Sequence, residues 1–325
     1  MGRGDRDACD ASCERMNLAP IAIFTYKRPE HTRRLLSCLL ANPEAAHSPV
    51  HVYSDGPKTA ADAPAVEATR EVVRSFDIPH LELTERPRNL GLARNVIDGV
   101  SALCAAHGRV IVLEDDLYLS PTFLAFMNQA LERYRDTREV MHVSGFMYPV
   151  RLPRGTQAVF LPFLSSSGWA TWERAWRHFD PEASGYARLA ADPRLRRAFD
   201  VDGSFYFFHM LELYRQGRAD SWAIRWYLSI FMRQGLAVYP AASLVENRGF
   251  DADATHSTGI VPPHMRAKAQ PFRAGALPDP MIDAEVLRAV TRLLGKEGTF
   301  HYKVVNKLRR MWRELTERPV ASSPG

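Results

Sequence analysis

The sequence predicts an α/β protein with a mostly parallel sheet covered by helices. Short apolar runs alternate four times with helical patterns in the first half of the chain, and the connections are short. Three of these runs end in polar or acidic residues, at 25–28, 54–56 and 114–116. Because ligands of such sheets bind beyond the carboxyl ends of the strands, this placement favours a binding site there. With 325 residues, 46% of them hydrophobic, the chain can bury a sizeable core.

The four strand–helix pairs follow one another between residues 19 and 136. In the first helix, leucines recur at helical spacing from residue 35 to residue 40, behind Pro29 near the helix start. The last helix begins with Ser120 as a plausible N-cap and Pro121 at its first position. The expected strands are 19–26, 50–58, 80–87 and 110–114, and the expected helices are 27–42, 65–76, 89–106 and 120–136.

The pattern changes after residue 140, where aromatic-rich extended segments are followed by several helices. The predicted extended segments are 140–149, 157–172 and 236–250, and the predicted helices are 172–179, 186–199, 205–216 and 220–235. Residues 261–280 hold five of the chain's 22 prolines and are interpreted as a linker, and 283–316 are predicted to be helical. We therefore divide the chain into a disordered leader (1–18), a first half (19–140), a second half (141–260) and a C-terminal extension (261–325).

Composition and charge exclude several classes of protein. The net charge of +5 is mild, and no nucleic-acid reading module accompanies it, so no nucleic-acid partner is expected. No apolar run approaches the roughly 20 residues that span a bilayer, and the first residues lack the apolar core of a signal peptide. Four cysteines show neither zinc nor disulfide spacing. Together these features predict a cytoplasmic protein.

The stretch "RVIVLEDDLYLSP" places Glu114, Asp115 and Asp116 directly after a buried strand. Like charges at this spacing repel one another, and partial burial raises the cost unless a cation lies among them. Mg²⁺ and Mn²⁺ prefer carboxylate oxygens and commonly keep waters or substrate phosphates as further ligands. The alternative is a solvated strand end. The polar ends of the other strands favour a metal site.

The chain resembles inverting glycosyltransferases of the GT-A fold, in the broad family 2 group, and is similar to the N-acetylglucosaminyltransferases that extend N-linked glycans. The resemblance covers residues 19–257. The segments that carry it are "IAIFTYKRPEHTRRLLSCL", "VYSDGPK", "RNLGLARNVIDGV", "VIVLEDDLYLSPTFLAFM", "SSSGWATWERAW" and "ADSWAIRWYLSIFMRQGLAVYPAASLVENRGFDADATHS". It implies a GT-A (Rossmann-like) mostly parallel sheet flanked by helices, with an acceptor-side subdomain and a C-terminal helical extension.

The resemblance also implies a role for each matching residue. Residues at the strand ends would bind the donor. Thr25, Tyr26 and Arg28 would cradle the nucleotide, and Asp55 would bind the base, while Asn89 and Gly91 would let the backbone approach the nucleotide, with Arg94 nearby. Glu114 and Asp115 would contact ribose or sugar. Gly168 and Trp169 would shape the sugar and acceptor pocket. Asp116 and His256 would hold the metal. Each of these residues also has a simpler interpretation when taken singly. Arg94 can be a surface residue of its helix, Asp55-Gly56 can be only a turn, and His256 can have a structural role.

The resemblance places the catalytic base at Asp220, in "RADSWAIRW". The base removes the proton of the acceptor hydroxyl on the face opposite the leaving group. The animal enzymes carry two adjacent acids before the tryptophan with the second as base, whereas Ser221 stands at that second position here. Asp220 can instead be the N-cap of its helix, and Asp180, Asp251 and Asp253 are weaker alternatives.

These observations predict a metal-dependent enzyme with Mn²⁺ or Mg²⁺ as cofactor. It moves a sugar from a nucleotide diphosphate sugar, expected to be UDP-linked, to a glycan, lipid-linked or other hydroxyl acceptor with inversion, in polysaccharide biosynthesis. A sugar nucleotidyltransferase and a non-catalytic nucleotide-sugar or glycan-binding protein are the alternatives. Residues 300–319 form a basic amphipathic pattern with Trp312, which can lie on the inner face of a membrane or dock on protein.

Overall fold

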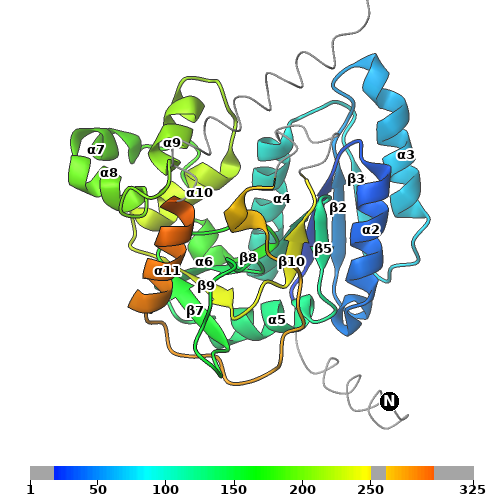
Figure 1. Cartoon of the computed structure of the whole chain (residues 1–325). Coiled ribbons are helices and arrows are strands. Elements are labelled where there is room, and N and C mark those ends of the chain that lie inside the picture. Colours follow the sequence, from blue (N-terminus) through cyan, green and yellow to red (C-terminus); the bar gives the residue numbers. More distant parts are fainter. Residues whose placement is uncertain (1–17, 250–260, 296–325) are drawn as a thin grey trace, which may run out of the picture.

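A computed structural model describes residues 18–249 and 261–295 and confirms the predicted α/β class (Figure 1). One eight-stranded sheet has the order β3-β2-β1-β4-β8-β6-β9-β7, and a two-stranded ribbon pairs β10 with β5. The strands of the large sheet are β1 Ile21–Thr25, β2 Val50–Ser54, β3 Leu81–Glu85, β4 Arg109–Glu114, β6 Val140–Ser144, β7 Ala158–Leu161, β8 Trp169–Trp172 and β9 Leu236–Pro240. The ribbon strands are β5 Leu117–Leu119 and β10 Val245–Asn247.

The first four strands of the large sheet are parallel, as the alternating pattern predicts; β1, β2 and β4 are largely buried, whereas β3 lies at the edge of the sheet and is half-buried to exposed. In the centre of this group Ile23 on β1 lies in register with Val52 on β2 and Leu113 on β4. All three side chains are fully buried. Since parallel strands are covered on both faces, continuous Ile, Val and Leu runs fit this arrangement better than an alternating pattern does.

The second half of the chain continues the same sheet in mixed orientation. Strand β8 runs antiparallel to β4, so Trp169 lies opposite Val112 and Trp172 lies opposite Arg109. The first residue of β8 therefore lies near the carboxyl end of β4. The proposed division at residue 140 stays a prediction, and the sheet extends across it.

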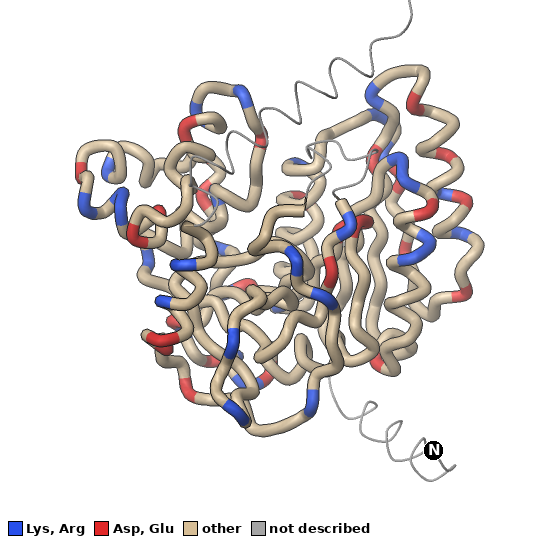
Figure 2. Tube along the Cα trace, in the orientation of Figure 1, with Lys and Arg blue, Asp and Glu red and all other residues tan. Residues whose placement is uncertain are grey.

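Helices cover the sheet, and most charged residues lie on them and on the loops (Figures 1 and 2). Helices α2 and α3 pack together, whereas α4 packs on β1 and β4 beside α6 and α10. The helices are α2 Pro29–Leu40, α3 Ala63–Arg74, α4 Leu92–His107, α5 Phe123–Arg133, α6 Glu173–Trp176, α7 Tyr186–Ala191, α8 Pro193–Phe199, α9 Phe207–Arg215, α10 Trp222–Phe231 and α11 Ala284–Gly295, with the short 3₁₀ helices η1 Pro43–Ala46, η2 Ala60–Asp62 and η3 Pro263–Met265. None of the described helices is long and apolar enough to cross a membrane.

Three local details differ from the sequence prediction. Helix α5 begins at Phe123 rather than at Pro121, since residues 120–122 form a turn in which Phe123 N–H donates to the carbonyl of Ser120. The predicted helix 186–199 is split in two at Asp192, whose side chain caps α8. The stretch 261–280, interpreted as a linker, contacts α5 and the turn before it: Phe272 N–H donates to Thr122 Oγ1 and Gln129 Nε2 donates to the carbonyl of Gly275.

Some predictions fall outside the described residues. These are the leader, the metal ligand His256, the alternatives Asp251 and Asp253, and the basic pattern at 300–319.

Candidate functional site

The three carboxylates lie where β4 ends, beside the carboxyl end of β1. Glu114 is in register with Phe24, so the residues that follow each strand meet at the same edge of the sheet. The backbone of Tyr26 lies close enough to the Asp115 carboxyl to lower its pKa, and Arg28 Nη1 lies 3.9 Å from an Asp115 oxygen. Both side chains of this ion pair are largely buried, with exposed fractions of 14% and 13%. The structure thus brings together the strand ends at 25–28 and 114–116.

Burial and mutual repulsion shift the pKa values of two of these acids strongly upward. Burial, followed by the charges of Asp116 and Asp115, raises the pKa of Glu114 to about 8. Burial and then Asp116 raise the pKa of Asp115 to about 7, while the charge of Arg28 lowers it. One arginine therefore does not neutralise the cluster, and a further cation would stabilise its charged form.

Trp222, the first residue of α10, connects the second half of the chain to this cluster. Its indole lies close enough to the Glu114 carboxyl to lower the pKa of that group. Its ring stacks on Trp169 at 4.9 Å between centroids, and Trp169 in turn stacks on His142 at 5.3 Å. The tryptophan-rich sequence around residue 222 indicated an acceptor-side segment, but the contact with Glu114 could not be foreseen from it.

Trp169 is placed differently from the prediction that it shapes a sugar pocket. Its side chain is fully buried, and stacking on His142 and Trp222 occupies the ring. The preceding Gly168 uses its carbonyl to accept from Gly145 N–H at 2.6 Å. In this conformation Trp169 supports Trp222 from inside the core, so a contact between Trp169 and a sugar would require rearrangement.

The ribbon of β5 and β10 brings residues 245–249 beside Asp116. Tyr118 on β5 lies opposite Glu246, and Arg248 N–H donates to the backbone carbonyl of Asp116 at 2.8 Å. A Cβ atom built on Gly249 would lie 2.1 Å from Asp116 Oδ2. The absence of a side chain at 249 therefore makes room for this carboxylate. Sequence reasoning missed Gly249, because the pairing that places it is between segments over 100 residues apart.

Asp55 is buried after β2, and its carboxylate anchors the segment at 89–91. Oδ1 accepts from the N–H groups of Gly56 and Leu90, at 2.9 and 2.8 Å. Oδ2 accepts from Asn89 Nδ2 and Gly91 N–H, at 2.9 and 3.0 Å. A carboxylate offers about four acceptor positions, so protein donors occupy all of them here. In this conformation Asp55 shapes the loop that would receive a nucleotide base, and a direct bond to the base would require one of these donors to leave.

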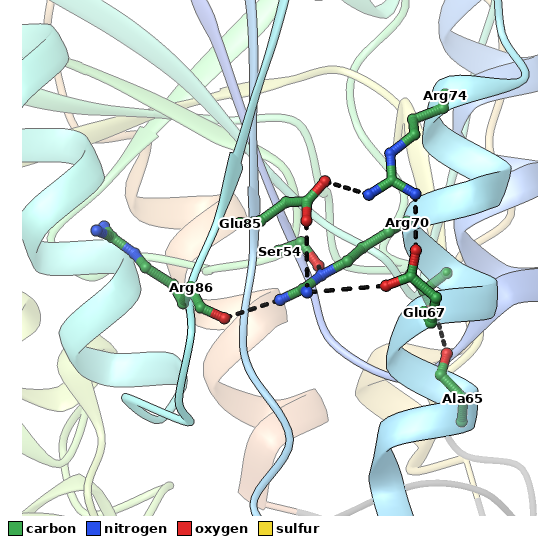
Figure 3. Close-up of polar contacts among 8 residues, drawn as sticks. Ser54, Ala65, Glu67, Arg70, Arg74, Glu85 and Arg86 are labelled. Carbon is green, nitrogen blue, oxygen red and sulfur yellow. Dashed lines mark hydrogen bonds and ion pairs between the residues drawn. The ribbon is translucent and has the colours of Figure 1, made fainter.

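A polar network fixes the carboxyl ends of β2 and β3 to α3 next to Asp55 (Figure 3). Arg70 is the centre of the network: Nη2 donates to the carbonyl of Arg86 at 2.8 Å and Nε donates to Ser54 Oγ at 3.3 Å. Glu85 forms ion pairs with both Arg70 and Arg74. The residue before Asp55 is thus held by a largely buried guanidinium, which keeps the strand end in place.

The remaining donor-binding candidates occupy different surroundings. Thr25 is buried, its carbonyl accepts from Asp55 N–H, and its hydroxyl has no partner among the described residues. Tyr26 donates through its hydroxyl to Asp62, which also pairs with Lys27 at 2.6 Å. Arg94 is 71% exposed and lies 3.5 Å from Asp98 on the same helix, which fits the alternative of a surface helix residue.

Asp220, the predicted base, lies just before α10 and does not cap it. Ser221 is the N-cap, and its hydroxyl accepts from Ile224 N–H. Asp220 instead accepts from Arg225 Nη2 at 2.8 Å. The Arg225 side chain is only 8% exposed and lies over the Tyr214 ring, while Asp220 is 66% exposed. A rigid arginine therefore orients an accessible carboxylate, two residues before the tryptophan that contacts Glu114.

A divalent cation fits the chemistry of the carboxylate cluster. Burial first, and neighbouring carboxylates second, raise the pKa values of Glu114 and Asp115, and the hydroxyl of Thr25 is buried without a partner among the described residues. Within residues 18–249 and 261–295, no three His, Cys, Asp or Glu side chains converge closely enough to hold a metal. The protein would thus supply one or two carboxylates, and substrate phosphates and water would complete the coordination.

Comparisons with known proteins give similarity to solved structures only. The sequence matches no protein-family model and no curated protein. The structure is similar to GalNAc-T7 with UDP, GalNAc and Mn²⁺ at a TM-score of 0.45 and 10% identity, over 75% of this chain and 52% of that chain. It is also similar to the mannosyltransferase PcManGT from Pyrobaculum calidifontis in complex with GDP-Man and Mn²⁺, at a TM-score of 0.36 and 12% identity, over 97% and 96% of the two chains.

A third similar structure is apo mouse xyloside xylosyltransferase 1, at a TM-score of 0.34 and 14% identity, over 66% of this chain and 82% of that chain. These neighbours are glycosyltransferases, and the chain spans about half the length of GalNAc-T7. All three TM-scores are below 0.5, so any proposal about activity rests on the residues of this chain.

Proposed function

We propose that the protein is a metal-dependent inverting glycosyltransferase that moves a sugar from a nucleotide diphosphate sugar to a hydroxyl acceptor. One observation carries the proposal: Arg28 and the three carboxylates 114–116 lie together where parallel strands end, beside the loop that Asp55 anchors. A cation and several acids at one sheet edge suit a ligand that combines phosphates with sugar hydroxyls.

The donor would bind across the ends of β1, β2 and β4. Arg28 would contact the diphosphate, and the loop at 89–91 would receive the base, expected to be uracil. Asp115 and Glu114 would accept hydrogen bonds from ribose or sugar hydroxyls. Asp116 would hold Mn²⁺ or Mg²⁺, which when bound neutralises the charge that develops on the leaving diphosphate.

Asp220 would act as the base toward the acceptor. Its carboxylate is accessible and is held at 2.8 Å by Arg225. As the acceptor oxygen forms a bond to the anomeric carbon, this carboxylate would take the hydroxyl proton while the bond to the diphosphate breaks on the opposite face. A direct displacement of this kind inverts the anomeric centre.

One alternative has a specific observation in its favour. Ser221 occupies the position of the second acid of the animal enzymes, and the structure uses its hydroxyl as the N-cap of α10. A protein that binds nucleotide sugars or glycans without turnover needs no second acid at this position, so a capping serine is compatible with it. A sugar nucleotidyltransferase is disfavoured, because "TYKRPEH" after the first strand contains no glycine for a phosphate loop.

The purified protein should be mixed with Mn²⁺, an acceptor panel and a panel of nucleotide sugars, and release of nucleoside diphosphate followed. The proposal expects release or transfer, with an inverted product anomer by proton NMR. Asp220→Asn should lower turnover by at least about 100-fold and preserve donor binding, since general bases contribute roughly 10²–10⁴. The control Asp279→Asn removes another exposed acid that pairs with an arginine and should change nothing.

Two results would reject the proposal. Pyrophosphate release from a sugar phosphate and a nucleoside triphosphate would identify a nucleotidyltransferase. Donor binding without turnover on any acceptor would identify a binding protein. The acceptor, the cytoplasmic location and a membrane contact through 300–319 stay predictions of the sequence.

A further inference from the structure

A cavity of about 650 Å³ lies at the amino ends of β6 and β9. Its walls come from the segment between α5 and β6, from α6, and from the turn after α10. Four arginines, one histidine and one aspartate line it: Arg138, Arg174, Arg177, Arg233, His178 and Asp136. The cavity is thus strongly basic.

This cavity is separate from the candidate donor site. Strand β8 leads from Trp169, opposite Val112 near the carboxyl end of β4, to Trp172, opposite Arg109 at its amino end. Helix α6, which lines the cavity, follows Trp172 directly. Strand β4 has six residues, Arg109–Glu114, and spans roughly 16–20 Å, so the cavity and Glu114 lie at opposite ends of this strand.

Arg174 forms a fixed part of the cavity wall. Its Nη2 donates to the carbonyls of Tyr134 and Val140, at 2.8 and 2.9 Å, and its Nε donates to the carbonyl of Arg135. The guanidinium lies 4.4 Å from the Trp172 ring centroid. Burial lowers its pKa. The Arg174 side chain on α6 thus binds carbonyls on both sides of Arg138, which fixes the loop that carries Arg138 to α6.

The other three arginines, at 138, 177 and 233, are available to a ligand. Each is exposed, and none makes a side-chain hydrogen bond or ion pair with another described residue. The single lining acid, Asp136, pairs with Arg135 at 3.4 Å. Burial, then Arg233 and Arg177, lower the pKa of His178, while Glu173 raises it, so both arginines act on this imidazole.

We propose that this cavity binds a ligand through a phosphate or diphosphate group. Guanidinium groups match the geometry of phosphate oxygens through paired N–H donors, and several converging cations favour a multiply charged anion. The volume lies in the range of small-ligand sites. The phosphate can belong to a soluble metabolite or to a phospholipid headgroup, since both present the same chemistry to the arginines.

The test measures binding of inorganic pyrophosphate by titration calorimetry in EDTA, at low ionic strength. Arg177→Ala/Arg233→Ala should weaken binding at least tenfold. Arg188→Ala/Arg194→Ala removes the same charge from two exposed positions on α7 and α8, and should weaken it less than twofold. Arg177→Lys/Arg233→Lys keeps the charge and loses the paired donors, so an intermediate loss is expected.

A second arm uses vesicles to identify the source of the phosphate. Co-sedimentation with phosphatidylglycerol vesicles, and not with phosphatidylcholine vesicles, identifies a lipid headgroup if Arg177→Ala/Arg233→Ala abolishes it and the control pair does not. Pyrophosphate binding without sedimentation identifies a soluble ligand. The proposal is overturned if neither probe binds, or if both arginine pairs weaken binding equally, which would mean a general charge effect.

Discussion

Asp55→Asn tests whether this carboxylate organises the base-binding loop. In the parent each oxygen accepts two N–H groups, from Gly56 and Leu90 on one and from Asn89 and Gly91 on the other. The amide replaces one oxygen by an NH₂ group, so two donors lose their acceptor. A buried donor left unpaired costs about 1–3 kcal/mol, so the predicted loss is about 2–6 kcal/mol. The loop is tightly packed at this point, because a Cβ atom built on Gly56 would lie 2.4 Å from the backbone of Arg88.

Urea denaturation followed by far-UV circular dichroism measures the loss in the free energy of unfolding. Asp98→Asn is the matched control, since Asp98 is exposed on α4 and makes only a surface pair with Arg94. Such a pair contributes about 0–1 kcal/mol. Equal stability of the two variants would refute the role assigned to Asp55, and its carboxylate would then be free to bind a base directly.

Three further predictions concern the site and the core. His142 is buried and neutral, with a pKa lowered to about 3 by burial, so an unfolded chain with its ordinary pKa near 6.5 binds the proton first. The stability that the neutral imidazole contributes is complete above pH 6.5 and falls as the pH drops toward 3. The free energy of unfolding of the parent should therefore fall by about 2 kcal/mol from this group between pH 7 and 5. In urea titrations at these two pH values, His142→Phe should show a decrease that is smaller by this amount. The pKa of Glu114 is raised, so its contribution to the free energy of unfolding has the opposite pH dependence. This contribution falls as the pH rises from about 4.5 to 8. Glu114→Gln without metal should therefore unfold at a higher temperature than the parent at pH 8 and at the same temperature at pH 4, and a variant less stable at pH 8 would contradict this. Gly249→Ala displaces the Asp116 carboxylate and should weaken Mn²⁺-dependent donor binding about tenfold at nearly unchanged stability, whereas unchanged binding in calorimetry would show that Asp116 tolerates the shift.

The sequence was most informative where local pattern decides structure. Strands β1 to β4 and their helices follow from apolar runs and helical spacing, and their parallel order brings the ends at Arg28, Asp55 and Asp115 to one edge of the sheet. The class of fold and the clustering of these strand ends could thus be predicted. Boundaries were less certain, as at α5, where a Ser-Pro turn precedes the helix instead of starting it.

The sequence was least informative where distant segments meet. The sequence pattern predicts no element for the three residues of β5, which form a strand through their pairing with β10. The same pairing places Gly249 against Asp116. The approach of Trp222 to Glu114, the pair of Arg225 with Asp220 and the occupied acceptor positions of Asp55 depend on tertiary contacts that no spacing rule encodes.

Thermal unfolding with UDP-sugars, with and without Mn²⁺, tests the donor site most directly. Any ligand that binds only the native state raises the unfolding temperature by mass action. The parent should be stabilised by donor and Mn²⁺ together more than by either alone, and Asp98→Asn should behave in the same way. Asp116→Ala should lose this joint stabilisation. If Asp116→Ala keeps it in full, the carboxylates 114–116 do not hold the metal and the proposed function loses its basis.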